Sequence, residues 1–516
     1  MFVDKLNVPS GITFDDVLLL PCKSNVEPDQ VDVTSRMSKN VSLNIPIVSA
    51  AMDTVTEADM AIAMAHEGGI GVIHRNMSRE RQVNEIREVK RADELLVRDV
   101  VTIAPNTSVQ AVWHLMTKEK VSGIPVVGIS KRLPTPSKSS DLVGVEVPLP
   151  KELSDGKLIG IVSRRDIRPI VESNPTKKVE KVMTKDLITG HEGIPLDDAL
   201  ERMYEHKIER LPIVDKKGNL KGMISMQDIL HRHQHPRAIR DEEGRLMVAA
   251  AVGPFDVERA VALDAAGADV LVVDCAHAHN MNVVNSAKVI KKKVGADVVV
   301  GNIATAEAAE ELVGFVDGIK VGVGPGSICT TRIVTGVGVP QLTAIASVVD
   351  VARKHKVPVI ADGGMKYSGD IAKAIAVGAN SVMVGNLIAG TDEAPGRTMT
   401  IKGRRYKQYR GMGSLGAMSG GESSDRYFQE KRGGLGSTKF VPEGVEGAIP
   451  YSGTVKDVTH QLVGGLKSAM GYIGAQNIGE MHKKARFIKI TPSGYKEGHP
   501  HDVLITDEAP NYPIDE

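Results

Sequence analysis

Short apolar runs alternate with amphipathic stretches along the chain from Leu246 onward. Val, Ile and Ala dominate the runs, and the stretches between them carry apolar residues at the spacing of one helix face. Continuous apolar strands separated by helices are typical of a parallel sheet that is covered on both faces. We therefore predict strands at Met247–Ala251, Val270–Val273, Val298–Val300, Gly318–Val321, Val357–Ala361 and Ser381–Val384, with helices that include Val257–Ala266, Ala306–Val313, Thr343–Lys354 and Ser368–Val377.

Two more units of this kind lie near the N-terminus. A predicted strand at Pro46–Ala50 precedes a helix at Glu57–Glu67, and a second strand at Ile70–Ile73 precedes a helix at Ser78–Lys90. Six strands do not close a barrel, but two plus six make eight, the strand count of a (β/α)8 TIM barrel. The predicted fold is therefore an α/β barrel encoded in two parts.

The two parts, residues 1–94 and 232–516, are separated by an insert at residues 95–231 that contains an internal repeat. Three blocks recur in the same order: 97–102 resembles 179–184, 122–127 resembles 209–214, and 160–166 resembles 222–228. Such a duplication predicts an inserted domain made of two copies of one β-α-β unit. The first copy has an additional polar stretch at about 131–157, which we expect to be a surface excursion.

The insert resembles a tandem pair of CBS modules, also called a Bateman domain. This resemblance implies a purine-nucleotide site, because Ser163 and Asp166 in the first copy, and Ser225 and Asp228 in the second, match the positions that meet ribose and phosphate in CBS pairs. A module that only aids assembly is equally compatible with the sequence.

Composition narrows the functional class. The chain has 516 residues, and its 64 Lys and Arg balance its 64 Asp and Glu, so no overall charge indicates binding to nucleic acid or to a membrane surface. Its three cysteines are odd in number and widely spaced, which fits a reducing compartment and no metal-ligand motif. No secretory signal and no apolar run of about 18 residues is present. We expect a cytoplasmic protein that requires neither a membrane nor nucleic acid.

Cys329 is the most informative residue. It lies in the glycine-rich segment Val321–Arg332, directly after a predicted strand. Glycines allow a backbone to approach a ligand closely. One interpretation is a tight turn with a half-buried cysteine; the other is a covalent nucleophile held over a nucleotide.

Polar residues also follow the other predicted strands, and function in such a barrel gathers where the strands end. Asp362 is suited to a ribose diol, because a carboxylate accepts hydrogen bonds from two hydroxyls. Backbone N–H groups and hydroxyls are donors of the kind that hold a phosphate, and here they would come from Gly363, Gly364, Gly385 and Ser327. Asp274 could bind a second ribose, that of a dinucleotide. Since no Rossmann fingerprint is present, a dinucleotide would bind at the barrel mouth itself.

A long segment, at about 404–453, precedes a predicted closing helix at Val455–Ile473. We expect this segment to be irregular, and irregular segments of this length in compact enzymes are usually lids or disordered. We call it the lid. Its Arg426-Tyr427 pair is either a group that reaches into the site or a solvated surface pair.

These features together resemble the IMP dehydrogenase / GMP reductase family over essentially the whole chain. The resemblance rests on Gly11–Leu19, Ser49–Glu57, the Cys329 loop and the lid. Within the family, the dehydrogenase carries the Arg-Tyr pair, here Arg426 and Tyr427. The reductase pattern has a glutamate at about Leu415, so both positions favour the dehydrogenase.

The resemblance implies NAD-dependent oxidation of IMP to XMP, the committed step of guanine nucleotide synthesis, through a covalent adduct on Cys329. Arg426 would activate the hydrolytic water, assisted by Tyr427 and Thr331. Two alternatives stay open: an NADPH-dependent GMP reductase, and a purine-nucleotide sensor without catalysis.

The site residues that the resemblance implies fall into three groups. IMP would contact Met52, Ser327, Asp362, Gly363, Gly364, Met383, Gly385, Asn386, Tyr409, Met412, Gly413 and Glu443, and NAD would contact Asp274, Asn302 and Gly322. A monovalent cation, normally K⁺, would bind carbonyls of Gly324, Gly326 and Cys329, with Glu497, Gly498 and His499 supplied by a neighbouring subunit of a homotetramer.

Two positions depart from the family pattern. Asn386 replaces a common serine beside the phosphate, although an amide can still donate a hydrogen bond. Ala278 replaces a usual glycine at the cofactor edge.

Overall fold

A computed structural model describes residues 2–93, 100–119, 121–128, 156–420, 424–427, 440–507 and 509–512. The chain divides into two compact units: residues 1–92 with 237–516, here called the barrel unit, and residues 93–236, here called the insert. Each unit has its own hydrophobic core.

Eight parallel strands close the barrel, in the order β11-β12-β13-β14-β15-β16-β4-β5. The strands are β4 (Ile47–Ser49), β5 (Ile70–Ile73), β11 (Ala249–Val252), β12 (Val270–Asp274), β13 (Asp297–Ile303), β14 (Gly318–Val321), β15 (Val359–Asp362) and β16 (Ser381–Val384). Nearly all of their residues are buried, as expected for strands with side chains packed on both faces. The predicted barrel is confirmed.

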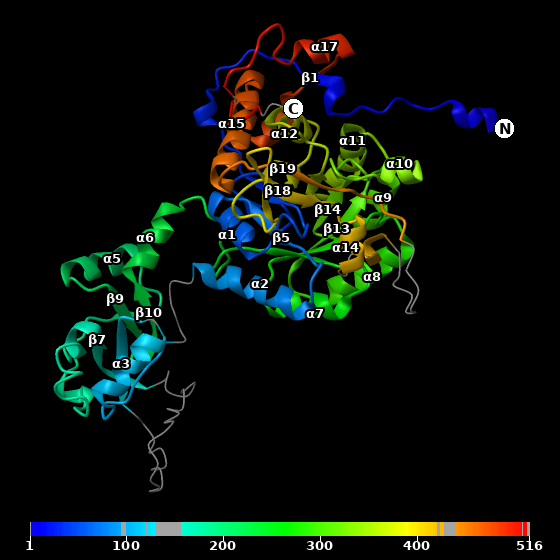
Figure 1. Cartoon of the computed structure of the whole chain (residues 1–516). Helices are drawn as coiled ribbons and strands as arrows, with labels where there is room; N and C mark the ends of the chain where they lie inside the picture. The colour runs from blue at the N-terminus through cyan, green and yellow to red at the C-terminus, as the bar shows by residue number, and fades with distance from the viewer. Residues whose placement is uncertain are drawn as a thin grey trace. The chain divides into compact units, whose positions relative to one another are not determined.

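Helices surround these strands (Figure 1). They are α1 (Ala58–Glu67), α2 (Arg79–Ala92), α7 (Val257–Ala265), α8 (Met281–Lys293), α9 (Ala306–Leu312), α11 (Gln341–Ala352), α12 (Ser368–Ala376), α13 (Asn386–Ala389) and α15 (Val455–Ile473). Close packing of helix on strand explains Gly71 in β5: a Cβ there would lie 2.5 Å from the Ala61 Cα of α1. Gly68 ends α1 in the left-handed conformation at φ 96°, which favours glycine.

The lid prediction was wrong at both ends. Residues 398–450 include a three-stranded antiparallel sheet of β17 (Thr398–Ile401), β18 (Arg404–Arg410) and β19 (Glu446–Pro450). In this sheet Tyr409 pairs with Gly447. Such a pairing between segments far apart in sequence leaves no local signal. Helix α14 (Leu415–Gly420) and the 3₁₀ turn η6 (Ser424–Tyr427) lie between β18 and β19 in the sequence, and residues 421–423 and 428–439 fall outside the described residues.

The remaining elements of the barrel unit are short. They are the strands β1 (Val17–Leu19), β2 (Ser35–Arg36), β3 (Ser42–Leu43) and β20 (Phe487–Lys489), the helices α10 (Thr331–Thr335), α16 (Ile478–Lys484) and α17 (Pro492–Glu497), and the 3₁₀ turns η1 (Phe2–Leu6), η2 (Phe14–Asp16), η3 (Pro28–Gln30) and η5 (Arg353–His355). β1 pairs with β20, which ties the start of the chain to its C-terminal region.

The insert consists of two similar halves. In the first, β6 (Gly123–Gly128) pairs with β7 (Lys157–Ser163); in the second, β9 (Arg210–Val214) pairs with β10 (Leu220–Ser225) and β8 (Gly190–His191). The register is equivalent in the two halves, because Pro125 pairs with Ile161 and Pro212 with Met223. The helices are α3 (Val109–Lys118), α4 (Arg164–Ile167), α5 (Leu196–Glu205) and α6 (Met226–Gln234), with the turn η4 (Val179–Lys181).

The assignment of the insert to CBS modules stays a prediction. Ser163 donates its hydroxyl to Asp166 at 2.7 Å, so these two proposed nucleotide contacts are bonded to each other. The side chain of Asp228 and most of the polar stretch at 131–157 lie outside the described residues. No helix in the described parts of the chain is long and apolar enough to cross a membrane.

Candidate active site

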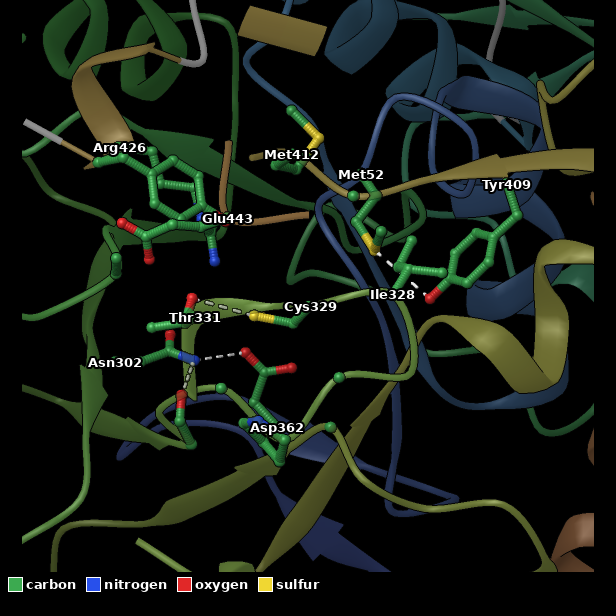
Figure 2. A pocket seen from close by; sticks show the side chains of 18 residues that line it. Met52, Asn302, Ile328, Cys329, Thr331, Asp362, Tyr409, Met412, Arg426 and Glu443 are labelled. Atoms are coloured by element: carbon green, nitrogen blue, oxygen red, sulfur yellow. Dashed lines mark hydrogen bonds between the residues drawn. The ribbon is translucent and has the colours of Figure 1, made fainter. Parts of the chain in front are cut away.

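A pocket lies at the carboxyl ends of the barrel strands, enclosed by the strand loops and by the lid. Fourteen of the predicted site residues line it: Met52, Asn302, Gly322, Gly324, Gly326, Cys329, Thr331, Asp362, Gly363, Tyr409, Met412, Arg426, Tyr427 and Glu443. Figure 2 shows Cys329 near the centre, with Arg426 and Glu443 on one side and Met52 and Tyr409 on the other. Ala276, Pro325, Ile328 and Gly411 also line the pocket and were not predicted as site residues, since small, apolar or backbone contributors carry no chemical signal.

Cys329 lies on the loop between β14 and α10, with its side chain partly exposed to the pocket. Its Sγ lies 3.1 Å from Thr331 Oγ1, and its backbone N–H donates to the Gly326 carbonyl at 3.1 Å. Cys275, by contrast, is fully buried. The geometry favours the reading of Cys329 as a group that faces a ligand over that of an ordinary core cysteine.

The returning part of the lid supports the Cys329 loop. The Val445 N–H donates to the Ile328 carbonyl at 3.0 Å, and the Thr330 N–H donates to the Glu443 carbonyl at 3.0 Å. These bonds flank the thiol on both sides along the chain. They fix the loop and bring the Glu443 side chain to the pocket wall.

Asp362 ends β15 and faces the same pocket. Its Oδ2 accepts a hydrogen bond from Asn302 Nδ2 at 2.9 Å, and the same amide donates to the Gly322 carbonyl at 2.6 Å (Figure 2). The three residues come from the ends of β15, β13 and β14, so barrel closure brings together groups predicted for two different ligands.

Lys320 is a charged residue beneath the pocket that the sequence analysis also missed. It is 1% exposed in β14, and its ammonium contacts Asn302, Asp362 and Asp274. A signal was present, because lysine is the single charged residue of the run Gly318–Val321, and fully buried lysines are rare unless paired.

Arg426 and Tyr427 of η6 point into the pocket. The Arg426 guanidinium pairs with the carboxylate of Asp274 at the end of β12, and the Ala276 N–H donates to the Arg426 carbonyl at 3.1 Å. Burial lowers the pKa of Arg426 below its ordinary value and raises the pKa of Tyr427. The reading of this pair as a solvated surface pair is wrong, because both side chains are largely buried.

Tyr409 of β18 forms another wall. Its hydroxyl lies 3.9 Å from Met52 Sδ, and burial raises its pKa to about 12, although a hydrogen bond with Ser327 acts in the other direction. Gly385 lies against the same two side chains, because a Cβ on it would come within 3.0 Å of the Tyr409 hydroxyl.

Several predicted residues lie behind the pocket wall. Gly413 packs against the Tyr427 ring, Gly364 packs against Pro325, and Met383 is 2% exposed beside Asp362 in the strand register. Asn386 begins α13. The predicted residues that do not line the pocket are Ser327, Gly364, Met383, Gly385, Asn386, Gly413, Asp274, Glu497, Gly498 and His499.

The residues predicted for a cation fall in two places. Gly324 and Gly326 line the pocket, and the Gly326 carbonyl, which accepts one N–H, has a second lone pair for a cation. Glu497 ends α17, and His499 Nδ1 lies 2.8 Å from the Tyr512 hydroxyl of the same chain. Within the described residues, no group of His, Cys, Asp and Glu could hold a metal ion.

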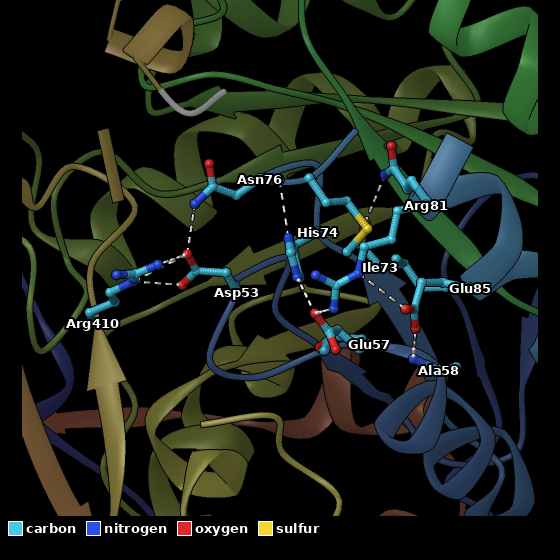
Figure 3. Close-up of polar contacts among 12 residues, drawn as sticks. Asp53, Glu57, Ala58, Ile73, His74, Asn76, Arg81, Glu85 and Arg410 are labelled. Carbon is cyan, nitrogen blue, oxygen red and sulfur yellow. Dashed lines mark hydrogen bonds and ion pairs between the residues drawn. The ribbon is translucent and has the colours of Figure 1, made fainter. Parts of the chain in front are cut away.

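A polar network anchors the pocket side of β18 (Figure 3). Arg410 donates through Nη2 to Asp53 Oδ2 at 2.6 Å, and Asn76 donates to the same oxygen at 2.7 Å. Asp53 follows Met52 after β4, so this pair fixes β18 to the end of a barrel strand. The sequence analysis did not single out Arg410 or Asn76.

The network continues through a buried histidine (Figure 3). His74 Nδ1 accepts the Asn76 N–H at 3.0 Å, so Nε2 carries the proton that faces Glu57 at 3.1 Å. Burial acts to raise the pKa of Glu57, but the bond from His74 and the charge of Arg81 outweigh it and lower the pKa. Glu57 is therefore a stable carboxylate acceptor.

Comparison with known proteins agrees with this geometry. A family model described as "IMP dehydrogenase / GMP reductase domain" matches residues 11–501. A protein from Halobacterium salinarum named inosine-5'-monophosphate dehydrogenase is 55% identical over 99% of this chain and 97% of its own length. The protein of the same name from Methanocaldococcus jannaschii is 54% identical and covers 100% of both chains.

Solved structures point to the other branch of the family. A cysteine-to-alanine variant of GMP reductase from Trypanosoma brucei, in complex with guanosine 5'-monophosphate, is 40% identical with a TM-score of 0.81, and the match covers 97% of this chain and 100% of that chain. A GMP reductase from the same organism in complex with guanosine 5'-triphosphate is 37% identical with a TM-score of 0.72, over 95% of this chain and 100% of that chain.

Proposed function

The chain belongs to the IMP dehydrogenase / GMP reductase family, and we propose that within this family it oxidises IMP to XMP with NAD⁺. One observation carries the proposal: the Cys329 thiol and the Arg426-Tyr427 pair face the same pocket. A nucleophile alone serves either branch of the family. A buried basic pair on the lid, next to that nucleophile, supports a hydrolytic second step.

The proposed first step forms a covalent adduct. The Cys329 thiolate attacks C2 of the IMP purine, forming an S–C2 bond, and C2 loses a hydride with its electron pair to NAD⁺. Covalent catalysis of this kind divides a difficult oxidation into two steps. Thr331 Oγ1, 3.1 Å from Sγ, is within reach of the thiol proton.

The proposed second step is hydrolysis. Water attacks C2, the S–C2 bond breaks, the thiol recovers a proton, and XMP is released. Arg426 and Tyr427 would activate the water, with Thr331 assisting. Burial lowers the pKa of Arg426 and so favours the neutral guanidine, the form that would accept the proton of the water, although arginine is normally protonated in proteins.

The proposed substrate contacts follow the pocket. IMP would bind between Cys329, Asp362 and Tyr409, with its phosphate toward Ser327, Gly364 and Gly385. NAD⁺, which supplies the hydride acceptor, would be held by Asp274, Asn302 and Gly322. A K⁺ ion would bind carbonyls of the Cys329 loop, completed by Glu497, Gly498 and His499 of a neighbour in a tetramer, and the insert would bind purine nucleotides.

The test is spectroscopic. The chain is mixed with IMP, NAD⁺ and K⁺, and the absorbance band of NADH is followed together with XMP by chromatography. Equal amounts of NADH and XMP are expected. No NADH from the wild-type chain would refute the proposal.

GMP reductase is the second candidate, favoured by the likeness to the Trypanosoma brucei GMP reductases. It predicts GMP-dependent consumption of NADPH and no IMP-dependent formation of NADH. A sensor without catalysis predicts nucleotide binding and neither reaction. Leu415, where the reductase pattern has a glutamate, supports the dehydrogenase.

A further inference from the structure

Lys320 lies beneath the pocket, in the interior of the barrel. Its side chain is 2% exposed, and its ammonium donates to Asn302 Oδ1 and, at 2.6 Å, to Asp362 Oδ2. It also lies 3.0 Å from Asp274 Oδ1, at an angle that makes this contact an ion pair and not an aligned hydrogen bond. Three acceptors thus surround the three N–H groups of one ammonium.

The three partners come from three different strands. Asp274 ends β12, Asn302 lies in β13 and Asp362 ends β15, whereas Lys320 itself lies in β14. β13 approaches β14 closely here, because a Cβ on Gly301 would lie 2.6 Å from the Lys320 Cβ. Side chains from β12, β13 and β15 therefore meet at the Lys320 ammonium.

The charges of these groups explain why a cation is needed at this position. The Asp274 side chain is 3% exposed and the Asp362 side chain 18%. Two largely buried carboxylates near each other repel, and one of them would take up a proton unless a cation lay between them. Lys320 is that cation. With Asp274 and Asp362 ionised, the group carries one net negative charge, and Arg426 neutralises it from the lid side.

The two carboxylates serve different ligands in the function proposed above. Asp362 lines the pocket beside Cys329, and Asp274 meets the lid, where the cofactor would bind. On the basis of that function, we propose that Lys320 is a positioning residue, the shared counter-ion that keeps Asp362 and Asp274 ionised and fixed at the barrel mouth.

Other titratable and charged groups face this cluster and bear on any pH dependence. Asp362 acts on Tyr409 across the pocket, Cys329 acts on the same phenol, and Arg75 faces Arg426. Among the described residues, these groups include Asp274, Asp362, Arg426, Arg75, Cys329, Tyr409, Tyr427 and Glu443.

The chain offers a matched control in Lys90. It is 5% exposed, and its ammonium lies 3.0 Å from Asp241 and 2.7 Å from Asp269. Asp269 directly precedes β12, at the opposite end of the strand from Asp274. Lys90→Met therefore removes the same kind of buried counter-ion at the far end of the barrel.

The first measurement needs no ligand. Thermal unfolding of Lys320→Met is followed from about pH 8 to about pH 5, with a melting temperature about 6–15 °C below wild type expected at the higher pH. Without its counter-ion, a buried carboxylate has a raised folded-state pKa. Protonation at low pH removes the buried charge and stabilises the folded variant, and this stabilisation is lost as the pH rises. The deficit should shrink toward low pH. A deficit independent of pH indicates lost packing alone and overturns the proposal.

The second measurement is calorimetric binding of IMP. Lys320→Met should bind IMP about 10- to 100-fold more weakly, with uptake or release of protons that wild type lacks. Lys320→Arg should restore part of the affinity, and Lys90→Met should bind within about twofold of wild type. Equal IMP affinity of wild type and Lys320→Met would overturn the proposal. If wild type binds GMP and not IMP, the function proposed above fails, and Lys320 is tested with GMP; if it binds neither, the ligand-free measurement decides.

Folding of the variant is itself informative. If Lys320→Met does not fold, Asp274→Asn is added to it, which removes one carboxylate from the cluster. Recovery of a folded chain supports the counter-ion role. A double variant that also fails to fold shows that lysine is needed for packing and contradicts the proposal.

Discussion

The guanidinium of Arg426 pairs with the carboxylate of Asp274, which joins the lid to the end of β12. Under the proposed function, Asp274 also binds the cofactor. One carboxylate cannot meet both partners in the same way, so lid closure and cofactor binding should compete. Under that proposal, the structure would correspond to the hydrolytic state, with the lid in the cofactor region.

Arg426→Ala should separate the two chemical steps. Under the proposed function, hydride transfer requires Cys329 and not the lid, so a burst of NADH equal to the enzyme concentration is expected. Turnover should then fall by about 10²- to 10⁴-fold, the usual contribution of a positioned acid or base. Stopped-flow absorbance and mass spectrometry of the accumulated adduct check this. Loss of the burst would assign Arg426 to hydride transfer instead.

Gly413→Ala should displace the lid from its closed position. The new Cβ would lie 2.7 Å from Tyr427 Cζ, and overpacking of this kind costs about 1–3 kcal/mol. A lower KM for NAD⁺ and a lower kcat are expected, because the closed lid competes with the cofactor and supports hydrolysis.

Gly447→Ala is the control for this prediction. Gly447 lies in β19 of the adjoining sheet, and a Cβ there meets no atom within 4 Å. Its kinetics should match wild type. Identical effects of the two substitutions would mean that crowding of Tyr427 is not the cause.

Cys329→Ser should abolish NADH formation, with a loss of more than about 10⁴-fold in turnover. Cys22→Ser is the matched control, because Cys22 is also partly exposed but lies near Arg486, with Sγ 3.8 Å from its Nη2. In the wild type, IMP should protect Cys329 from alkylation and leave the Cys22 rate unchanged, as measured by peptide mass spectrometry. Unprotected Cys329 would contradict its place beneath the purine.

Tyr409 should make stability fall at alkaline pH. Burial raises its pKa from 10.0 to about 12 in the folded chain, so the folded state holds the proton more tightly than the unfolded state. The contribution of the Tyr409 proton to the unfolding free energy is complete below pH 10 and is lost as the pH rises toward 12. Two pKa units correspond to about 2–3 kcal/mol.

Tyr409→Phe provides the comparison. The difference in unfolding free energy of the barrel between wild type and Tyr409→Phe should decline between about pH 10 and pH 12. Denaturant unfolding followed by circular dichroism measures it. A constant difference across this range would show that the phenol does not titrate as a buried group.

Local patterns predicted several barrel strands at their observed bounds, even where one polar residue lies in a mostly apolar run. The ranges predicted for Gly318–Val321 and Ser381–Val384 coincide with β14 and β16. Val298–Val300 was predicted too short, because polar Asp297 and Asn302 lie inside β13. Backbone hydrogen bonds to segments distant in sequence hold these two residues in place: the Asp297 N–H donates to the Asp269 carbonyl, and the Asn302 N–H donates to the Cys275 carbonyl.

Local sequence also identified part of the pocket, whereas Tyr409, Met412 and Glu443 were expected from the family resemblance. A glycine, a carboxylate or a thiol after an apolar strand is a short-range signal, and parallel strands bring all such ends to one face. Residue chemistry and strand order were therefore sufficient to expect Cys329, Asp362 and Asn302 together.

Only the tertiary structure decided which of these groups touch. Arg426 reaches Asp274, and Lys320 lies between two carboxylates, because the closed barrel and the folded lid bring distant segments within bonding distance. The pairing of β18 with β19 arises in the same way. These contacts depend on long-range geometry and on the free-energy cost of burying a charge without a partner. Neither can be derived from the spacing of residues along the chain.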